Sequence, residues 1–330
     1  MLTGRLHTLV VESGVLRDNP LGDPARRELP VYLPPVADPA GLPVIFVLAG
    51  FTGVGAGQLR GTPWEPAFPE RYERLLATGQ CAPAAFVFPD CFTRFGGSQY
   101  MNSAATGRYE DHLLQEVLPL VEREFGVGGR RERRGVMGKS SGGFGALHLS
   151  LQRPDVFAAL ASHSGDCAFD LCYPPDFPKL LAQLDKHGSV PAFMAAFEQA
   201  PRKTGPLVLA MNVLAMAAAY SPDLSAPGGL ALPFELRTGR QRPDVWARWL
   251  AFDPVPRVAR AGERLRDFRL VFVDAGLRDE YQLQYGARQL VDALREKGVA
   301  VHHEEFDDGH MGVSYRYDAS LPLITRALSA

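Results

Sequence analysis

Eight short apolar runs, rich in β-branched residues, constrain the fold of this chain more than any other feature of the sequence. Gly/Pro turns or amphipathic helical segments separate them, which is the pattern of a sheet with helices on its faces. The first two runs predict an antiparallel pair, and the later, almost wholly apolar runs predict buried parallel strands. We therefore expect an α/β protein with a mostly parallel eight-stranded sheet and helices on both faces. The runs are residues 6–13, 29–35, 43–50, 84–90, 133–138, 157–165, 268–276 and 299–306.

Two segments between the runs have the spacing of helices that pack on a sheet. In residues 109–125 apolar side chains recur at helical intervals and acidic ones fill the opposite face. Pro119 interrupts this pattern and predicts a kink or a break. In residues 281–298 a similar apolar stripe is followed by Gly298, which is placed to end the helix.

Residues 170–255 depart from the alternation of strands and helices. They contain proline clusters, an apolar helical stretch at 207–220 and a Gly/Pro-rich segment after it. The apolar stretch is too short for a membrane span, which needs about 20 residues. We expect residues 1–330 to be a single domain in which 170–255 form a lid or side wall. An interface helix or a core-filling helix is an equal alternative for the apolar stretch.

Charge and cysteine content argue against several classes of function. The chain has 35 Lys and Arg against 37 Asp and Glu, a net charge of -2, so it has no bulk field to attract nucleic acid or an anionic membrane. The N-terminus lacks the basic region, apolar run and cleavage site of a secretory signal, so we expect a cytoplasmic protein. The four cysteines are too few for a disulfide framework and form no C-x-x-C pair. We expect free thiols and no metal site.

The stretch GVMGKSSGG at 135–143 allows two chemistries. A phosphate-binding loop would need a glycine at position 133, where the chain has Arg133, so the spacing argues against a nucleotide site. The alternative is a G-x-S-x-G turn between a strand and a helix, and both flanking segments have the required character. Such a turn holds a strained backbone, which requires small residues at Gly138 and Gly142. It predicts Ser140 as a nucleophile, with the positive end of a helix behind it.

A serine nucleophile needs a base, and in this kind of sheet the acid and then the histidine should follow the serine along the chain. His310 lies on a glycine-containing loop just beyond the last expected strand and is the predicted base. His163 ends a strand but precedes any late acid, and it fits a packed polar residue better. His112 is expected on an exposed helix face. The other histidines lie in unsuitable places, namely His7, His148, His187, His302 and His303.

The predicted acid is Asp279, three residues after the strand at 268–276, where a loop carboxylate can reach the far nitrogen of the base. Glu280 is a competitor, but it suits the start of the next helix, where an acid complements the positive helix end. Asp274 is expected to lie too deep in the strand. Asp166 is a further alternative, since some hydrolases take the acid from the preceding strand.

Backbone amides should stabilise the oxyanion that such a reaction forms. One is the amide of Ser141, and the other comes from the glycine-rich loop at 47–57, where Phe51 is preferred and Gly50 is the alternative. Several further residues are candidates for the substrate pocket, with ordinary packing or solvation as the alternative for each. These candidates are Gly50, Tyr100, Lys139, Asp166 and Cys167.

The stretches that carry Ser140, Asp279, His310 and Phe51, together with several others, resemble the putative-esterase (esterase D) family of α/β-hydrolases. This family includes S-formylglutathione hydrolases, siderophore esterases, feruloyl esterases and mycolyltransferases. The resemblance implies the α/β-hydrolase fold, with Ser140 as nucleophile, Asp279 as acid, His310 as base, and Phe51 and Ser141 as oxyanion donors. The matching stretches include RRELPVYLPP, VIFVLAGFTG, GSQYMNSAATGRYEDHLLQEVLP, GVMGKSSGGFGALHLSLQRPDVFAALASHSGD, DAGLRDEYQLQYGARQL and EEFDDGHMGVSYRYD.

The segment Ala49-Gly50-Phe51 is closer to the formylglutathione branch than to the His-Gly pattern of many α/β-hydrolases, whereas residues 170–255 are longer than that branch implies. We therefore expect a serine hydrolase that cleaves short-acyl carboxylic esters, or thioesters, through an acyl-enzyme without a cofactor. Its partners would be small-molecule esters, and homo-oligomerisation stays open. Two alternatives remain: an acyltransferase of the same fold, and a non-catalytic binding protein.

Overall fold

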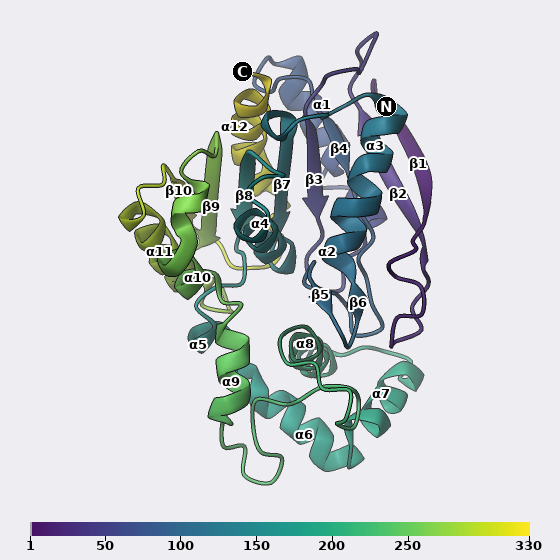
Figure 1. Ribbon diagram of the computed structural model, residues 1–330, viewed down its shortest axis with the longest axis vertical. Coiled ribbons are helices and arrows are strands. Elements are labelled where there is room, and N and C mark those ends of the chain that lie inside the picture. Colours follow the sequence, from purple (N-terminus) through teal and green to yellow (C-terminus); the bar gives the residue numbers. More distant parts are fainter. Residues whose placement is uncertain (1) are drawn as a thin grey trace.

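The computed structural model describes residues 2–330, and its centre is an eight-stranded, mainly parallel sheet (Figure 1). Its strands are β1 (Arg5–Glu12), β2 (Arg26–Leu33), β3 (Val44–Leu48), β4 (Ala85–Val87), β7 (Arg134–Lys139), β8 (Ala159–His163), β9 (Leu270–Gly276) and β10 (His302–Phe306). Each predicted run supplies one strand, so the expected sheet is confirmed. The strand order is β1-β2-β4-β3-β7-β8-β9-β10. Strand β2 is antiparallel to β1 and β4, and all other neighbours are parallel.

Helices cover both faces of this sheet (Figure 1). One face carries α1 (Phe68–Ala77) and α12 (Tyr317–Ser329), and the other carries α3 (Leu118–Phe125), α4 (Ser141–Gln152), α10 (Pro254–Ala261) and α11 (Leu283–Glu296). Successive side chains of a strand point to opposite faces, so Phe46 of β3 joins one apolar cluster while Val47 joins the other. Both are fully buried, which explains why the central runs are apolar at every position.

Residues 109–125 form one helical segment whose winding changes in the middle. Helix α2 (Tyr109–Asp111) continues into a π-helical stretch at His112–Val117 and then into α3. Pro119 lies in the first turn of α3, where a proline is tolerated, so the expected interruption takes the form of the π-helical stretch. The expectation that His112 is exposed is wrong. Its side chain is buried because the carboxylate of Glu116, 2.9 Å from Nδ1, satisfies the ring.

A helical layer formed within residues 170–255 lies beneath the sheet in Figure 1. The apolar stretch at 207–220 becomes helix α8, which lies inside this layer and is buried along most of its length. The Trp249 ring packs against Tyr220 at the end of α8, with 5.4 Å between ring centroids. Enclosure on several sides explains why this helix lacks a polar face. The layer consists of α5 (Phe169–Cys172), α6 (Phe177–His187), α7 (Val190–Gln199), α8 (Gly205–Tyr220) and α9 (Pro243–Leu250). A small two-stranded sheet, β5 (Asn102–Ser103) with β6 (Gly107–Arg108), adjoins α8.

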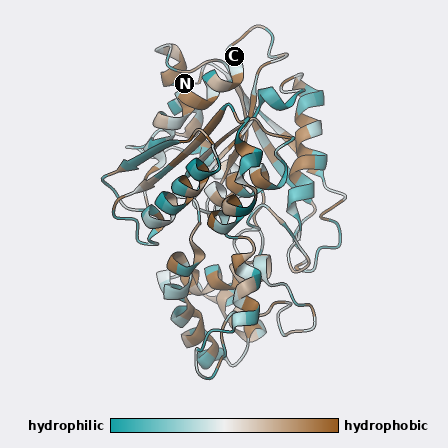
Figure 2. Cartoon of the chain, turned by 60° about the vertical axis from the view of Figure 1, so that its left-hand side comes forward, coloured by the Kyte–Doolittle hydropathy of each residue, from teal (hydrophilic) through white to brown (hydrophobic). Residues whose placement is uncertain are grey.

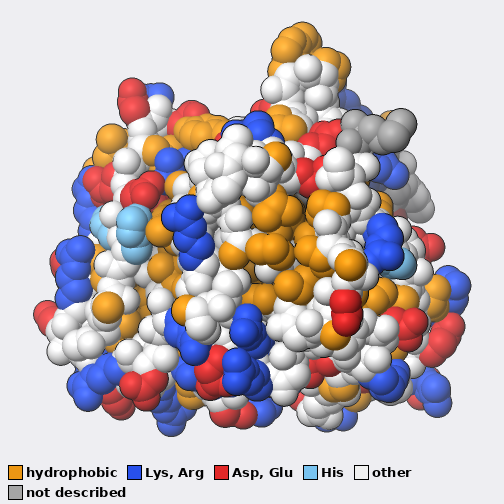
Figure 3. All heavy atoms as spheres, turned by 90° about the horizontal axis from the view of Figure 1, so that it is seen from above, with side chains coloured by type: hydrophobic (Ala, Val, Ile, Leu, Met, Phe, Trp, Pro, Cys, Tyr) orange, Lys and Arg blue, Asp and Glu red, His pale blue; other side chains and the backbone are white. Residues whose placement is uncertain are grey.

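The distribution of hydropathy follows this layering. Hydrophobic residues run along the strands, and many outward helix positions are hydrophilic (Figure 2). The face seen from above in Figure 3 has hydrophobic side chains at its centre, with charges of both signs interspersed around them. Among residues 2–330, no helix combines the length and the hydropathy that crossing a membrane requires.

Candidate active site

Ser140 stands at the turn between β7 and α4, and its backbone is held in an unusual conformation. Its φ of 57° and ψ of -126° are values that residues other than glycine rarely adopt. Its amide donates to the carbonyl of His163 at 2.9 Å. A Cβ at Gly138 would lie 2.5 Å from the carbonyl oxygen of Gly142, and a Cβ at Gly142 would lie 2.1 Å from that of Leu48. The two glycines are therefore required by close backbone packing around the turn.

His310 follows β10 and forms hydrogen bonds with two other predicted site residues. Its Nε2 lies 3.0 Å from Oγ of Ser140, and its Nδ1 lies 2.8 Å from Oδ2 of Asp279. Asp279 is buried, and its Oδ1 accepts the backbone N–H of Tyr281 at 2.9 Å. With a proton on Nδ1, the Nε2 atom of His310 is free to accept the hydroxyl proton of Ser140. The structure thus brings the three residues into one chain of hydrogen bonds.

The segment after Asp279 also holds the loop that carries His310. Oε2 of Glu280 accepts the backbone N–H of His310 at 2.7 Å, and the Tyr281 ring packs edge-on against the imidazole, with 4.8 Å between centroids. The expectation that Glu280 begins the next helix is wrong, because the chain first makes a turn and α11 starts at Leu283. The Glu280 carboxylate contacts the backbone of the histidine loop instead of a helix end.

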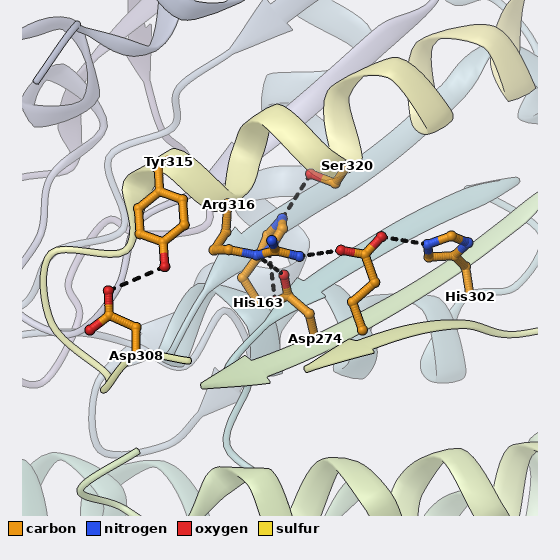
Figure 4. Close-up of polar contacts among 8 residues, drawn as sticks. His163, Asp274, His302, Asp308, Tyr315, Arg316 and Ser320 are labelled. Carbon is orange, nitrogen blue, oxygen red and sulfur yellow. Dashed lines mark hydrogen bonds and ion pairs between the residues drawn. The ribbon is translucent and has the colours of Figure 1, made fainter. Parts of the chain in front are cut away.

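Three other residues, Ser320, His163 and Asp274, form a second hydrogen-bonded set of serine, histidine and aspartate (Figure 4). Nδ1 of His163 lies 2.9 Å from Oδ1 of Asp274, and its Nε2 lies 2.8 Å from Oγ of Ser320. All three side chains are buried. Asp274 also accepts a hydrogen bond from Nε of Arg316 at 2.9 Å, and Arg316 pairs with Glu304. His163 is therefore a packed polar residue and Asp274 is enclosed at the strand, as predicted.

A cavity of about 460 Å³ adjoins Ser140 and His310. It is lined by the loop after β3, the turn between β7 and α4, one side of α8 and the segments around Tyr281 and Met311. Apolar and aromatic side chains share the lining with many polar ones, such as Gln58, Lys139 and Ser314, so the cavity can hold a small molecule with both apolar and polar groups. Five of the residues expected near a substrate line this cavity: Gly50, Phe51, Lys139, Ser141 and Asp166.

Two other candidates for the pocket do not line the cavity. Tyr100 is buried under the loop after β3, where its hydroxyl donates to the carbonyl of Ala49 at 2.6 Å. Cys167 points toward α11, where a Cβ at Gly286 would lie 2.8 Å from its Sγ. Both side chains are therefore part of the packing behind the cavity wall.

The backbone of the loop after β3 lies close to the turn that carries Ser140. A Cβ at Gly50 would lie 3.5 Å from Cβ of Ser140. Within residues 2–330, the N–H groups of Phe51 and Ser141 donate to no carbonyl or side chain. Ser141 is the first residue of α4, so its N–H has no partner inside the helix. Both amides are therefore unpaired within residues 2–330, and both residues line the cavity.

Burial shifts the pKa of two ionisable side chains at the cavity. Burial raises the pKa of Asp166, although hydrogen bonds from Gln99 and Tyr173, each 3.0 Å from its Oδ2, oppose the shift. His310 is hydrogen-bonded to Asp279 and not to this alternative acid. Burial also lowers the pKa of Lys139, against the opposing effect of nearby carboxylates.

Two residues at this site, Tyr281 and Asn212, were not among those predicted from the sequence. Tyr281, which packs on the imidazole of His310, gave no signal beyond its position after Asp279 and Glu280. Asn212 of α8 lines the cavity, and its signal was visible as a polar residue inside the apolar stretch at 207–220. In residues 2–330, no group of three or more His, Cys, Asp or Glu side chains could hold a metal ion. The four cysteines are free and buried.

Comparison with known sequences identifies a family. The sequence profile described as "Putative esterase" matches residues 24–327. The "Uncharacterized protein YbbA" of Bacillus subtilis is 28% identical over 151 residues, which are 42% of this chain and 56% of that protein. The aligned chain therefore spans little more than half of the length of this relative.

Solved structures share the fold at low sequence identity. A ferulic acid esterase is 19% identical, with a TM-score of 0.61, and the match covers 99% of this chain and 100% of that chain. An S-formylglutathione hydrolase from Agrobacterium tumefaciens is 16% identical, with a TM-score of 0.60 and coverage of 99% and 97%. At such identities the likeness shows the α/β-hydrolase fold alone.

Proposed function

The chain belongs to the putative-esterase family, and we propose that it is a carboxylesterase-type hydrolase that cleaves short-acyl carboxylic esters through an acyl-enzyme on Ser140. His310 acts as the base, and Asp279 orients the imidazole and stabilises its charged form. The observation that carries the proposal is the hydrogen-bonded chain from Ser140 through His310 to Asp279, which adjoins the cavity.

The reaction runs in two halves. The Ser140 hydroxyl gives its proton to Nε2 of His310 while Oγ attacks the ester carbonyl, and the amides of Phe51 and Ser141 stabilise the oxyanion. The tetrahedral intermediate collapses, and His310 returns the proton to the departing alcohol. A water molecule then gives a proton to His310 and attacks the acyl-enzyme, which releases the acid and restores the Ser140 hydroxyl.

The cavity supports a substrate of limited size. Its volume of about 460 Å³ lies in the lower part of the range for small-molecule sites, roughly 300 to 1,000 Å³. We further propose that residues 170–255 serve as a side wall of this site within a single domain. Val208, Leu209 and Asn212 support this role, since all three line the cavity from α8.

Hydrolysis of p-nitrophenyl esters from acetate to decanoate tests the proposal, with wild type and Ser140→Ala side by side. We expect activity that peaks at a short acyl chain and is absent from the variant. A fluorophosphonate should label the wild type and not Ser140→Ala. Equal rates for the two proteins, together with no labelling, would favour a binding protein. If added glycerol diverts the acyl group into a glycerol ester in preference to free acid, the protein is an acyltransferase.

A further inference from the structure

Two polar side chains that line the cavity have unused hydrogen-bonding capacity. Asp166 receives hydrogen bonds from Gln99 and Tyr173 at its Oδ2 alone, and its Oδ1 has no partner within residues 2–330. Oδ1 is not one of the fully enclosed polar atoms, so it is open to the cavity. The side-chain amide of Asn212 also lines the cavity and makes no hydrogen bond to the described part of the chain.

The Asp166 carboxylate is held in one orientation. Asp166 is buried, with only 8% of its surface exposed. Gln99, which donates to it at 3.0 Å, also donates to the Tyr220 hydroxyl at 2.8 Å, and that hydroxyl lies 3.1 Å from the hydroxyl of Tyr173. This network ties Asp166, three residues after the end of β8, to Tyr220, the last residue of α8. A carboxylate fixed in this way presents its free oxygen at one defined point, which suits selection between substrates.

Asn212 stands out in the sequence of its helix. Residues 207–219 of α8 read LVLAMNVLAMAAA, and Asn212 is the one residue in that run with a polar side chain. It lies one turn after Val208, on the side of α8 that faces the cavity. The side chain is only partly buried, so water reaches its amide when no ligand is bound. The amide is therefore free to pair with a polar group of a ligand in the cavity.

We propose that Asp166 and Asn212 form a subsite for a free hydroxyl group of the ester substrate. The hydroxyl donates its hydrogen to Oδ1 of Asp166 and accepts a hydrogen bond from the amide of Asn212, which satisfies both open groups. This inference rests on the proposed function, because it names the class of ester that the same site selects. The hydroxyl belongs either to the acyl part or to the alcohol part of an uncharged ester.

A neutral hydroxyl suits this subsite better than an ammonium group. Burial raises the pKa of Asp166, which disfavours the ionised form that would attract a cation, even though Gln99, Tyr173 and His310 oppose the shift. Lys139 lines the same cavity and would repel a cation. Asn212 adds no charge, so the pair of open groups matches a polar group that both donates and accepts.

Matched pairs of esters test the inference. The acyl arm compares methyl 3-hydroxybutyrate with methyl butyrate, and the alcohol arm compares 1-glyceryl monobutyrate with propyl butyrate. Titration of the released acid in a pH-stat gives kcat/KM, which is divided by the rate constant for alkaline hydrolysis of the same ester to remove differences in intrinsic reactivity. We expect the hydroxylated member of one pair to be favoured by about tenfold, because its rival leaves the open groups unpaired.

Variants then locate the preference. Asp166→Asn keeps the shape but turns the free acceptor into a donor, and Asn212→Leu removes the amide at similar volume. Each should reduce the preference to about twofold or less. Asp170→Asn is the matched control, since Asp170 accepts from Nε1 of Trp246 at 2.8 Å and does not line the cavity. It should keep the wild-type preference. If Asp166→Asn does not fold, Asn212→Leu decides.

The outcomes separate this inference from the proposed function. Equal normalised rates within both pairs would overturn the subsite while ester hydrolysis through Ser140 stands. Faster turnover of methyl 3-aminobutyrate than of methyl 3-hydroxybutyrate would overturn the assignment of a hydroxyl. If the wild type cleaves no ester and matches Ser140→Ala, the proposed function fails, and the inference fails with it.

Discussion

Nε2 of His310 lies 3.0 Å from Oγ of Ser140, although 170 residues separate the two in the chain. The topology of the sheet explains this approach. Ser140 follows β7, His310 follows β10, and β8 and β9 lie between these strands. Because the strands are parallel, their carboxyl ends share one edge of the sheet, and the loop after β10 can reach across to Ser140. Asp279 follows β9 and lies within reach of the same imidazole.

Replacing Asp279 with asparagine should reduce kcat on a p-nitrophenyl ester by about 10⁴-fold. An amide donates to Nδ1 and so favours the wrong tautomer of His310, which then has no free Nε2 to accept the Ser140 proton. Stopped-assay kinetics across pH 5 to 9 measure the loss. Asp307→Asn is the control, since this exposed residue of the loop before His310 forms an ion pair with Arg278 on the surface. Full activity of Asp279→Asn would transfer the role of acid to Glu280 or Asp166.

Replacing Gly142 with alanine should damage both stability and activity. The added Cβ would lie 2.1 Å from the carbonyl oxygen of Leu48, so β3 and α4 would have to separate at the turn that carries Ser140. We expect a loss of about 1–3 kcal/mol in the free energy of unfolding, measured by urea denaturation, together with lower kcat. Gly205→Ala is the matched control at the start of α8, where nothing lies within 4 Å of the new Cβ. It should be neutral or stabilising by up to about 1 kcal/mol. Equal effects of the two changes would contradict the packing argument.

The sheet and the central site residues could be predicted because each depends on local pattern. A strand that is covered on both faces must be apolar at every position, so β3 was visible as an uninterrupted run. Ser140 was visible because close backbone contacts force glycine at Gly138 and Gly142. His310 and Asp279 could be predicted because, in this kind of sheet, the acid and then the histidine lie on loops after the strands that follow the serine.

The direction of side chains in short loops could not be predicted from the sequence. Asp166 and Cys167 are adjacent, yet the first lines the cavity and the second faces α11. Glu280 follows Asp279 directly, but it contacts the backbone of the histidine loop and not the imidazole. The rotation of α8 about its axis could not be predicted either. A helix that is apolar on all sides has no apolar stripe, so the sequence does not indicate which way Asn212 points.

Replacing Arg316 with methionine should destabilise the protein strongly. Its Nε donates to the fully buried carboxylate of Asp274, which also holds His163 (Figure 4). Removing the guanidinium leaves a buried charge without its main cationic partner, which costs about 3–5 kcal/mol in the free energy of unfolding. The same change at Arg242, whose pair with Asp244 is largely exposed, should cost less than about 1 kcal/mol. Urea denaturation of both variants measures the difference, and similar losses would show that the buried position of Asp274 is unimportant.

The stability of Asp166→Asn relative to wild type should depend on pH. Burial raises the folded-state pKa of Asp166 above its usual 3.8, so the stability that its protonated form contributes is fully present below 3.8 and is lost as pH rises through the folded-state pKa. Asparagine cannot ionise, so the free energy of unfolding should shift in favour of the variant as pH rises from about 4 to 7, measured by urea denaturation. Tyr173→Phe should steepen the loss in an otherwise wild-type chain, because it removes a hydrogen bond that lowers the pKa of Asp166. A difference that does not change with pH would mean that ionisation of Asp166 does not oppose folding.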